Sequence, residues 1–130
     1  MSKKSILYLV LALLWVYEIT FLSLFLIDDG KSSFWLDFPH KDKVGHFGFY
    51  FGFVFLWHIF FKSLGVIALK KIIVAAIIYG ILMEILQYIM PYGRMFDVKD
   101  MIANSIGAIL AYFFIKNVLP FIGRALKRKN

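Results

Sequence analysis

The chain has no cysteine, three prolines and few charged residues for its length. Without cysteine it has no disulfide, no thiolate nucleophile and no thiolate metal site, so the redox compartment cannot be inferred. Only 18% of the 130 residues are charged and 62% are hydrophobic, whereas soluble domains average about 25% charged residues. A water-soluble chain this short cannot bury so much apolar surface. The composition therefore indicates a small membrane protein of one domain.

Four apolar runs are long enough to cross the hydrocarbon core of a bilayer. They predict an all-α fold, a four-transmembrane-helix bundle, as a single domain over residues 1–130. The fourth run is expected to end before Pro120, since proline interrupts a helix. The predicted spans are about 5–27, 44–61, 71–90 and 98–119.

Basic residues outnumber acidic ones by 15 to 8 and lie mainly at the ends of these runs. With four spans, ten lysines and arginines fall on the side of both termini and five on the other side. The positive-inside rule then places both termini in the cytoplasm. The net charge of +7 is interpreted as a signal for topology and for lipid head groups, so nucleic acid is not an expected partner.

Polar residues inside the third span share one helix face. Glu84 and Gln87 are three residues apart, and Tyr88 is four residues after the glutamate. At about 1.5 Å per residue, Glu84 lies roughly 9 Å below Met90, in the outer half of the bilayer. A carboxylate at this depth needs a hydrogen-bond donor or a raised pKa. We therefore interpret Glu84 as a functional residue.

Polar residues also lie at the outer ends of the second and fourth spans. His46 lies about one turn into the second span, and Asp42 precedes it by four residues. The fourth span opens with four polar residues spaced three, three and four apart, followed on the same face by Gly107 and Ala111. Gly107-xxx-Ala111 and Gly48-xxx-Gly52 are expected to allow close helix approach. The four polar residues are Arg94, Asp97, Asp100 and Asn104.

Most of these residues also have a purely structural interpretation. Asp97 can serve only as the N-cap of the fourth helix, and Arg94 can anchor at the head groups. His46 can make a structural hydrogen bond, and Gln87 and Asn104 can hold helices together.

Combined, these residues resemble the VanZ family of bacterial membrane proteins. The resemblance implies an integral protein of the bacterial cytoplasmic membrane. It also implies an association with low-level resistance to teicoplanin-type lipoglycopeptides, whose target is the lipid-linked cell-wall precursor at the outer surface. It implies no particular reaction. The matching pieces are Asp42-Lys43-xx-His46, Glu84-xx-Gln87 and Pro91-xx-Arg94-xx-Asp97-xx-Asp100-xxx-Asn104-xx-Gly107.

Two classes of function remain open. In the first, the site is enzymatic and acts on a lipid-linked or amphipathic substrate. His46 is then the general acid or base, and Glu84 orients it or acts as a second acid, with Asp100 as a third candidate catalytic residue. The candidate binding residues, which would include those that hold an anionic head group, are Asp42, Gln87, Arg94, Asp97 and Asn104.

In the second class the polar residues form a buried network, and the outer surface binds membrane lipid, precursor or lipoglycopeptide without catalysis. Coupled transport is disfavoured because the chain shows no inverted repeat. A hard divalent metal held by His46, Glu84, Asp97 and Asp100 is a variant of the enzymatic hypothesis. No spacing in the sequence is a metal signature, so neither a metal nor another cofactor is expected.

Overall fold

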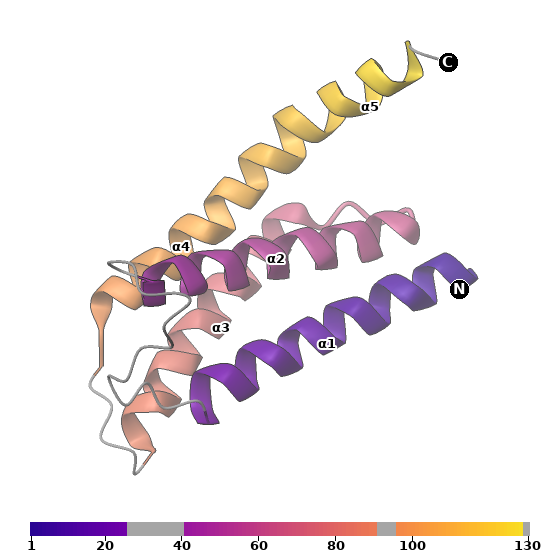
Figure 1. Ribbon diagram of the computed structural model, residues 1–130. Helices are drawn as coiled ribbons and strands as arrows, with labels where there is room; N and C mark the ends of the chain where they lie inside the picture. Colours follow the sequence, from indigo (N-terminus) through magenta and orange to yellow (C-terminus); the bar gives the residue numbers. More distant parts are fainter. Residues whose placement is uncertain (26–40, 91–95, 129–130) are drawn as a thin grey trace.

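The computed structural model describes residues 1–25, 41–90 and 96–128, with the side chains of residues 41 and 42 outside the described part (Figure 1). All regular secondary structure in these residues is helical, as predicted. The elements are α1 (Lys3–Phe25), α2 (Lys41–Ser63), α3 (Leu69–Ile89), α4 (Val98–Phe113), the π-helical segment η1 (Phe114–Val118) and α5 (Leu119–Lys127). Four helices are long and apolar enough to cross a membrane, and the last of them runs unbroken over Val98–Lys127.

The fourth helix continues through Pro120, so the expectation that it ends there is wrong. Pro120 lies at the start of α5, inside the continuous helix, where proline removes one backbone hydrogen bond and its ring crowds the preceding turn. The preceding segment η1 is wound more loosely, and the Leu119 N–H donates to the carbonyl of Phe114 five residues earlier. This π-helical turn lets the chain pass the proline without breaking the helix.

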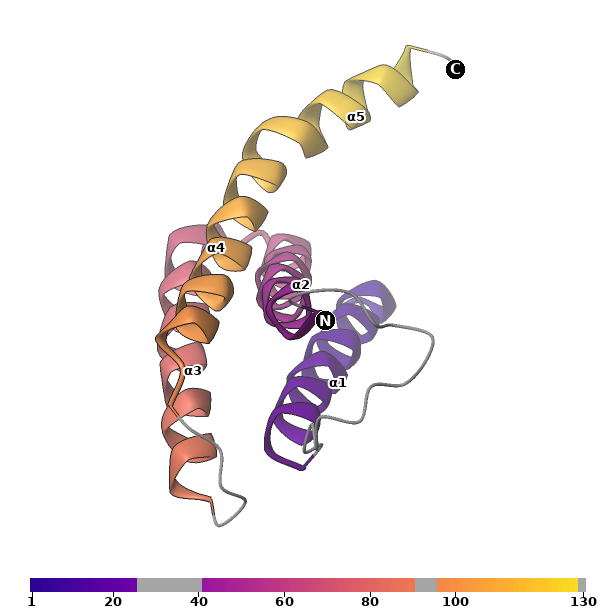
Figure 2. The same ribbon diagram turned by 60° about the vertical axis from the view of Figure 1, so that its left-hand side comes forward.

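Both described ends of the chain lie at the same end of the bundle (Figure 1). The end of α1, the start of α2, the end of α3 and the start of α4 lie together at the opposite end. In the second view, α4 passes along α2 and α3, and α5 then projects away from the other helices (Figure 2). No residue of α5 is buried.

Helix α2 contributes the centre of the core. Tyr50 and Val54 are fully buried, and they pack with Ile19 of α1, Ala76 of α3 and Ala108 of α4. Small residues on α3 and α4 therefore face a large aromatic side chain on α2, which allows close packing of the helices.

Glycines set two close approaches in the bundle. A Cβ atom at Gly107 of α4 would lie 2.3 Å from the backbone oxygen of Phe47 on α2, and Ala111 one turn later is fully buried. A Cβ at Gly52 would lie 2.6 Å from the Trp15 indole of α1, whereas one at Gly48 would meet no atom of the described residues within 4 Å. The predicted close approach is confirmed for Gly107, Ala111 and Gly52, and it is wrong for Gly48.

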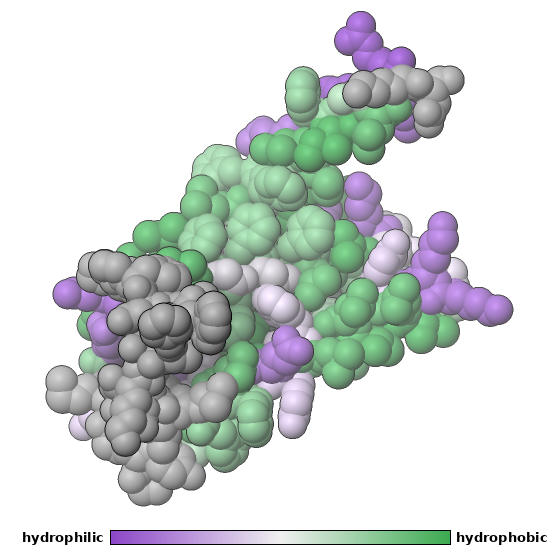
Figure 3. Space-filling model, viewed as in Figure 1, coloured by the Kyte–Doolittle hydropathy of each residue, from purple (hydrophilic) through white to green (hydrophobic). Residues whose placement is uncertain are grey.

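The lateral surface of the bundle is apolar. Large hydrophobic side chains are exposed along the helices, among them Leu14 of α1, Ile78 of α3 and Ile109 of α4. Green, hydrophobic atoms cover most of the middle of the molecule, and purple, hydrophilic atoms gather near the chain termini (Figure 3). A surface of this kind is stable in hydrocarbon and not in water.

Candidate functional site

A polar site lies between three helices at the end of the bundle away from the termini. We define this polar site as Lys43 and His46 at the start of α2, Glu84 in the last two turns of α3, and Asp97, Asp100 and Asn104 at the start of α4. Glu84, Asp100 and Asn104 are buried, whereas the side chain of Asp97 is 40% exposed. Side chains that are far apart in the sequence thus meet because three helices converge.

The outer part of the polar site is a salt bridge that joins Lys43 to both Asp97 and Asp100, which we call the ion pair. The Lys43 ammonium donates to Asp97 Oδ2 at 2.9 Å and also to Asp100 Oδ1. One cation therefore contacts two carboxylates, and this group of three side chains carries a net charge of −1. The pair joins α2 to the first turn of α4 and lies partly in solvent.

Asp97 is the N-cap of α4 and also a member of this ion pair. Its Oδ1 accepts a hydrogen bond from the Lys99 backbone N–H at 2.8 Å, as an N-cap side chain does. The hydrogen bond from Lys43, followed by that from Lys99, holds the pKa of Asp97 below its ordinary value of 3.8. The capping interpretation from the sequence is confirmed, and the contact with Lys43 adds to it.

His46 lies deeper, between two residues of α4. Its Nδ1 lies 3.0 Å from Asn104 Oδ1. An amide oxygen only accepts hydrogen bonds, so Nδ1 is the donor, and in a neutral imidazole Nε2 then carries the lone pair. Nε2 lies 3.5 Å from Asp100 Oδ2, which exceeds the usual hydrogen-bond distance. The ring is therefore oriented with its second nitrogen toward the carboxylates.

Glu84 lies at the bottom of the polar site and is 2% exposed. One side-chain atom each of His46, Glu84 and Asp100 lies within 4.8 Å of the other two. Burial of a carboxylate costs several kcal/mol unless a charge or donor compensates it, about 2.5–3.5 kcal/mol at the centre of a membrane helix on insertion scales. His46, Glu84 and Asp100, the three candidate catalytic residues predicted from the sequence, thus lie close together.

Asn104 connects His46 to the core below the site. Its Nδ2 is buried and has no hydrogen-bond partner within the described part of the chain. A Cβ atom at Gly80 of α3, one turn before Glu84, would lie 3.2 Å from this nitrogen and 3.2 Å from the Tyr50 ring. The absence of a side chain at Gly80 thus makes room for the carboxamide.

Gln87 is buried but has a structural contact on another helix. Its Nε2 donates to the Ser23 backbone oxygen of α1 at 2.8 Å. This bond holds α1 against α3, as expected of a polar residue that joins membrane helices. Tyr88, four residues after Glu84 on the same helix, is exposed and is not buried with Glu84 and Gln87.

Two candidate site residues predicted from the sequence, Arg94 and the Asp42 side chain, lie outside the described residues. Glu18, an ionisable residue of α1, is exposed. Lys43 is a site residue that was not predicted from the sequence, although its position three residues before His46 on one helix places both on the same face.

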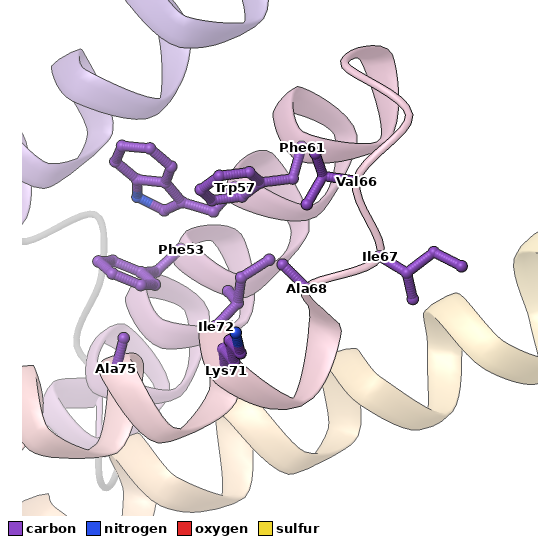
Figure 4. Close-up of a pocket in the computed structure, with 9 residues that line it drawn as sticks. All are labelled: Phe53, Trp57, Phe61, Val66, Ile67, Ala68, Lys71, Ile72 and Ala75. Atoms are coloured by element: carbon purple, nitrogen blue, oxygen red, sulfur yellow. The ribbon is translucent and has the colours of Figure 1, made fainter.

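A separate apolar pocket lies in the other half of the bundle. It has a volume of 480 Å³ and lies between the second half of α2 and the start of α3, with Lys71 as its one charged lining residue (Figure 4). Trp57, which lines it, is 11 residues from His46, or about 16 Å along α2. The pocket is therefore distinct from the polar site.

Fold and site together define a multi-pass helical membrane protein with a buried polar site near one end. The model of the VanZ/LLP1 family matches residues 5–120, and the chain belongs to this family. No match was found among the curated proteins or the solved structures.

Proposed function

We propose that this protein lies in the bacterial cytoplasmic membrane with both termini in the cytoplasm and binds the head group of a lipid-linked cell-wall precursor at the outer leaflet. The positions of the described ends, together at one end of the bundle (Figure 1), support this topology, as does the distribution of lysine and arginine. The polar site then faces the leaflet in which such precursors are exposed.

The observation that carries the proposal is the gradient of exposure through the polar site. The side chain of Asp97 is 40% exposed and that of His46 12%, whereas Glu84 is 2% exposed. The outer flanks of the helices are apolar (Figure 3). An amphipathic ligand can therefore keep its hydrocarbon chain in the bilayer while its head group enters between α2, α3 and α4.

Binding of this kind accounts for the resistance associated with the family. A lipoglycopeptide and the polar site would compete for the same precursor at the same leaflet. The bound precursor is shielded, so the expected effect is a modest rise in the teicoplanin concentration that inhibits growth.

Glu84→Gln tests the proposal, because it keeps the volume and hydrogen-bonding capacity of the side chain but removes its charge. We expect the purified variant to bind a lipid-linked precursor at least about tenfold more weakly by native mass spectrometry, the loss of one strong polar contact. The resistance of a host that expresses it should fall in parallel. Glu18→Gln is the matched control and should behave as the unmodified protein. Equal precursor binding by both variants would contradict the proposal.

A second candidate function is a hydrolase or transferase that uses His46 and Glu84 on a lipid or amphipathic substrate. The orientation of the imidazole, with Nδ1 held by Asn104 and Nε2 turned toward Asp100, supports it. Incubation with the precursor should then release head group and lipid as separate products, or transfer the head group to an acceptor. His46→Ala should abolish the products, and intact precursor after prolonged incubation with folded protein would exclude this candidate.

A further inference from the structure

We propose that His46, Glu84 and Asp100 bind one divalent transition-metal ion. The chemistry of these three ligands favours Zn²⁺. The three residues come from α2, α3 and α4, and the donor atoms lie within 4.8 Å of one another. One imidazole and two carboxylates are a ligand set that zinc accepts, with a fourth position left for an oxygen ligand. Magnesium and calcium instead prefer oxygen ligands alone.

The distance between His46 Nε2 and Asp100 Oδ2 suits a shared metal ion better than a direct hydrogen bond. In a tetrahedral zinc site with bonds of about 2.0–2.1 Å, donor atoms lie about 3.3–3.4 Å apart. His46 Nε2 and Asp100 Oδ2 are 3.5 Å apart. The widest separation in the group, at most 4.8 Å, needs a contraction of about 1.4 Å to reach the tetrahedral distance.

The hydrogen bond to Asn104 prepares His46 for a metal. Metal-binding histidines generally donate their other ring N–H to an oxygen acceptor, which fixes the tautomer and the ring orientation. Asn104 Oδ1 plays this part for Nδ1, at 3.0 Å. The Nε2 lone pair of the neutral ring then faces a carboxylate oxygen, and a cation between the two atoms makes the contact favourable.

The buried amide nitrogen of Asn104 is a second, independent observation. Asn104 is 2% exposed, and within the described residues its Nδ2 has no hydrogen-bond partner. The nitrogen lies beside Gly80, at a place that a side chain there would fill. It is a buried donor on the residue that orients His46, and an oxygen ligand of the metal, such as water or a head-group oxygen, would be a suitable acceptor for it.

The ratio of carboxylates to lysine in the ion pair also suits a cation. Lys43 contacts both Asp97 and Asp100, so one lysine is shared by two carboxylates. A divalent ion held by the three donors could bridge them to an oxygen of a bound head group. This bridging role rests on the proposed function, but the binding of the metal does not.

The test is metal binding by the full-length protein in detergent. After treatment with EDTA, the protein is titrated with Zn²⁺ by calorimetry, and retained zinc is measured by mass spectrometry after dialysis. We expect one ion per chain. His46→Ala, Glu84→Gln and Asp100→Asn should each weaken binding at least about 100-fold, and Asn104→Ala about 10–100-fold, because it removes only the residue that orients His46.

Two matched controls separate this site from other acidic groups. Glu18→Gln makes the same change as Glu84→Gln on an exposed residue of α1, and Asp97→Asn makes the same change as Asp100→Asn outside the three donors. Both should bind zinc at least tenfold more tightly than their partners. Circular dichroism and gel filtration show whether each variant is folded, and absorption of bound Co²⁺ reports tetrahedral coordination.

Equal zinc retention by the unmodified protein and the variants of the three donors would overturn the proposal, as would no binding by the unmodified protein. Preference for Mg²⁺ over Zn²⁺ would also overturn it. Precursor binding measured in EDTA distinguishes the two proposals. Binding that persists without zinc leaves the proposed function intact, whereas zinc binding without precursor binding contradicts that function alone.

Discussion

The Asp97 carboxylate makes two contacts that both depend on its negative charge. It caps α4 through Lys99 N–H and pairs with Lys43, and both contacts favour its ionised form. Its pKa is therefore lower in the folded protein than the ordinary value of 3.8. Stabilisation from a lowered carboxyl pKa is fully present above the unfolded value and is lost as the pH falls through the folded value.

We accordingly predict that the stability advantage of the unmodified protein over Asp97→Asn is constant near neutral pH and declines below about pH 4. Melting temperatures in a detergent without titratable groups, measured from pH 7 to pH 2.5, check this. Asp97→Ser retains a capping oxygen, so it should lose the pH-dependent part and keep much of the rest. An advantage that grows on acidification would contradict the assignment.

Gly107 allows a close approach of the backbones of α2 and α4. A methyl group there would lie 2.3 Å from the Phe47 carbonyl oxygen, which is backbone and cannot rotate away. Gly107→Ala should therefore destabilise the protein by about 1–3 kcal/mol, as overpacking does. Gly48→Ala, whose methyl group would meet none of the described residues within 4 Å, should leave the melting temperature unchanged or slightly higher. Similar losses for the two variants would show that the contact with Phe47 is not the cause.

At the scale of elements, α1 depends on a few polar contacts for its place. Trp15 Nε1 donates to the Phe49 carbonyl of α2 at 2.8 Å, Thr20 Oγ1 lies 2.6 Å from Tyr79 Oη of α3, and Ser23 O accepts from Gln87. Hydrogen bonds between helices are the specific component of packing in a membrane, where apolar contact alone does not distinguish helix from lipid.

Two tryptophans provide a matched test of this contribution. Trp15→Phe removes the hydrogen bond to Phe49, whereas the Trp57 indole nitrogen has no hydrogen-bond partner in the described part of the chain. Trp15→Phe should therefore cost about 1 kcal/mol more than Trp57→Phe. Unfolding of both variants in mixed micelles measures the difference. A greater loss for Trp57→Phe would contradict the role given to Trp15.

The sequence predicted the helices well because their lengths follow from the thickness of the bilayer and from apolar composition. It predicted His46, Glu84 and Asp100 together because ionisable residues are costly in a membrane and cluster for that reason. It could not show that Gln87 turns to Ser23, nor that Lys43 contacts two aspartates, because both contacts depend on helix rotation. The path of the fourth helix through Pro120 depends on a π-helical turn that has no clear signal in the sequence.

At the scale of the whole molecule, the proposed function requires that the polar site face the outside of the cell and that both termini lie in the cytoplasm. Because the chain has no cysteine, any single cysteine introduced into it is the only target for a thiol reagent. Lys99→Cys, beside the polar site, should react with a membrane-impermeant maleimide added to intact cells. Ser2→Cys and Lys127→Cys should react only after the cells are opened. The reverse pattern would contradict the proposed topology.

The π-helical segment has a consequence for the direction of the C-terminal end. A helix with one extra residue in a turn resumes with its faces rotated by about 100° relative to an uninterrupted α-helix. The segment Phe114–Val118 therefore determines toward which side of the helix axis Arg124 and Lys127 point. Deleting one residue from this segment would leave the length of the helix almost unchanged. It would rotate the basic face of α5 by about 100° around the helix axis.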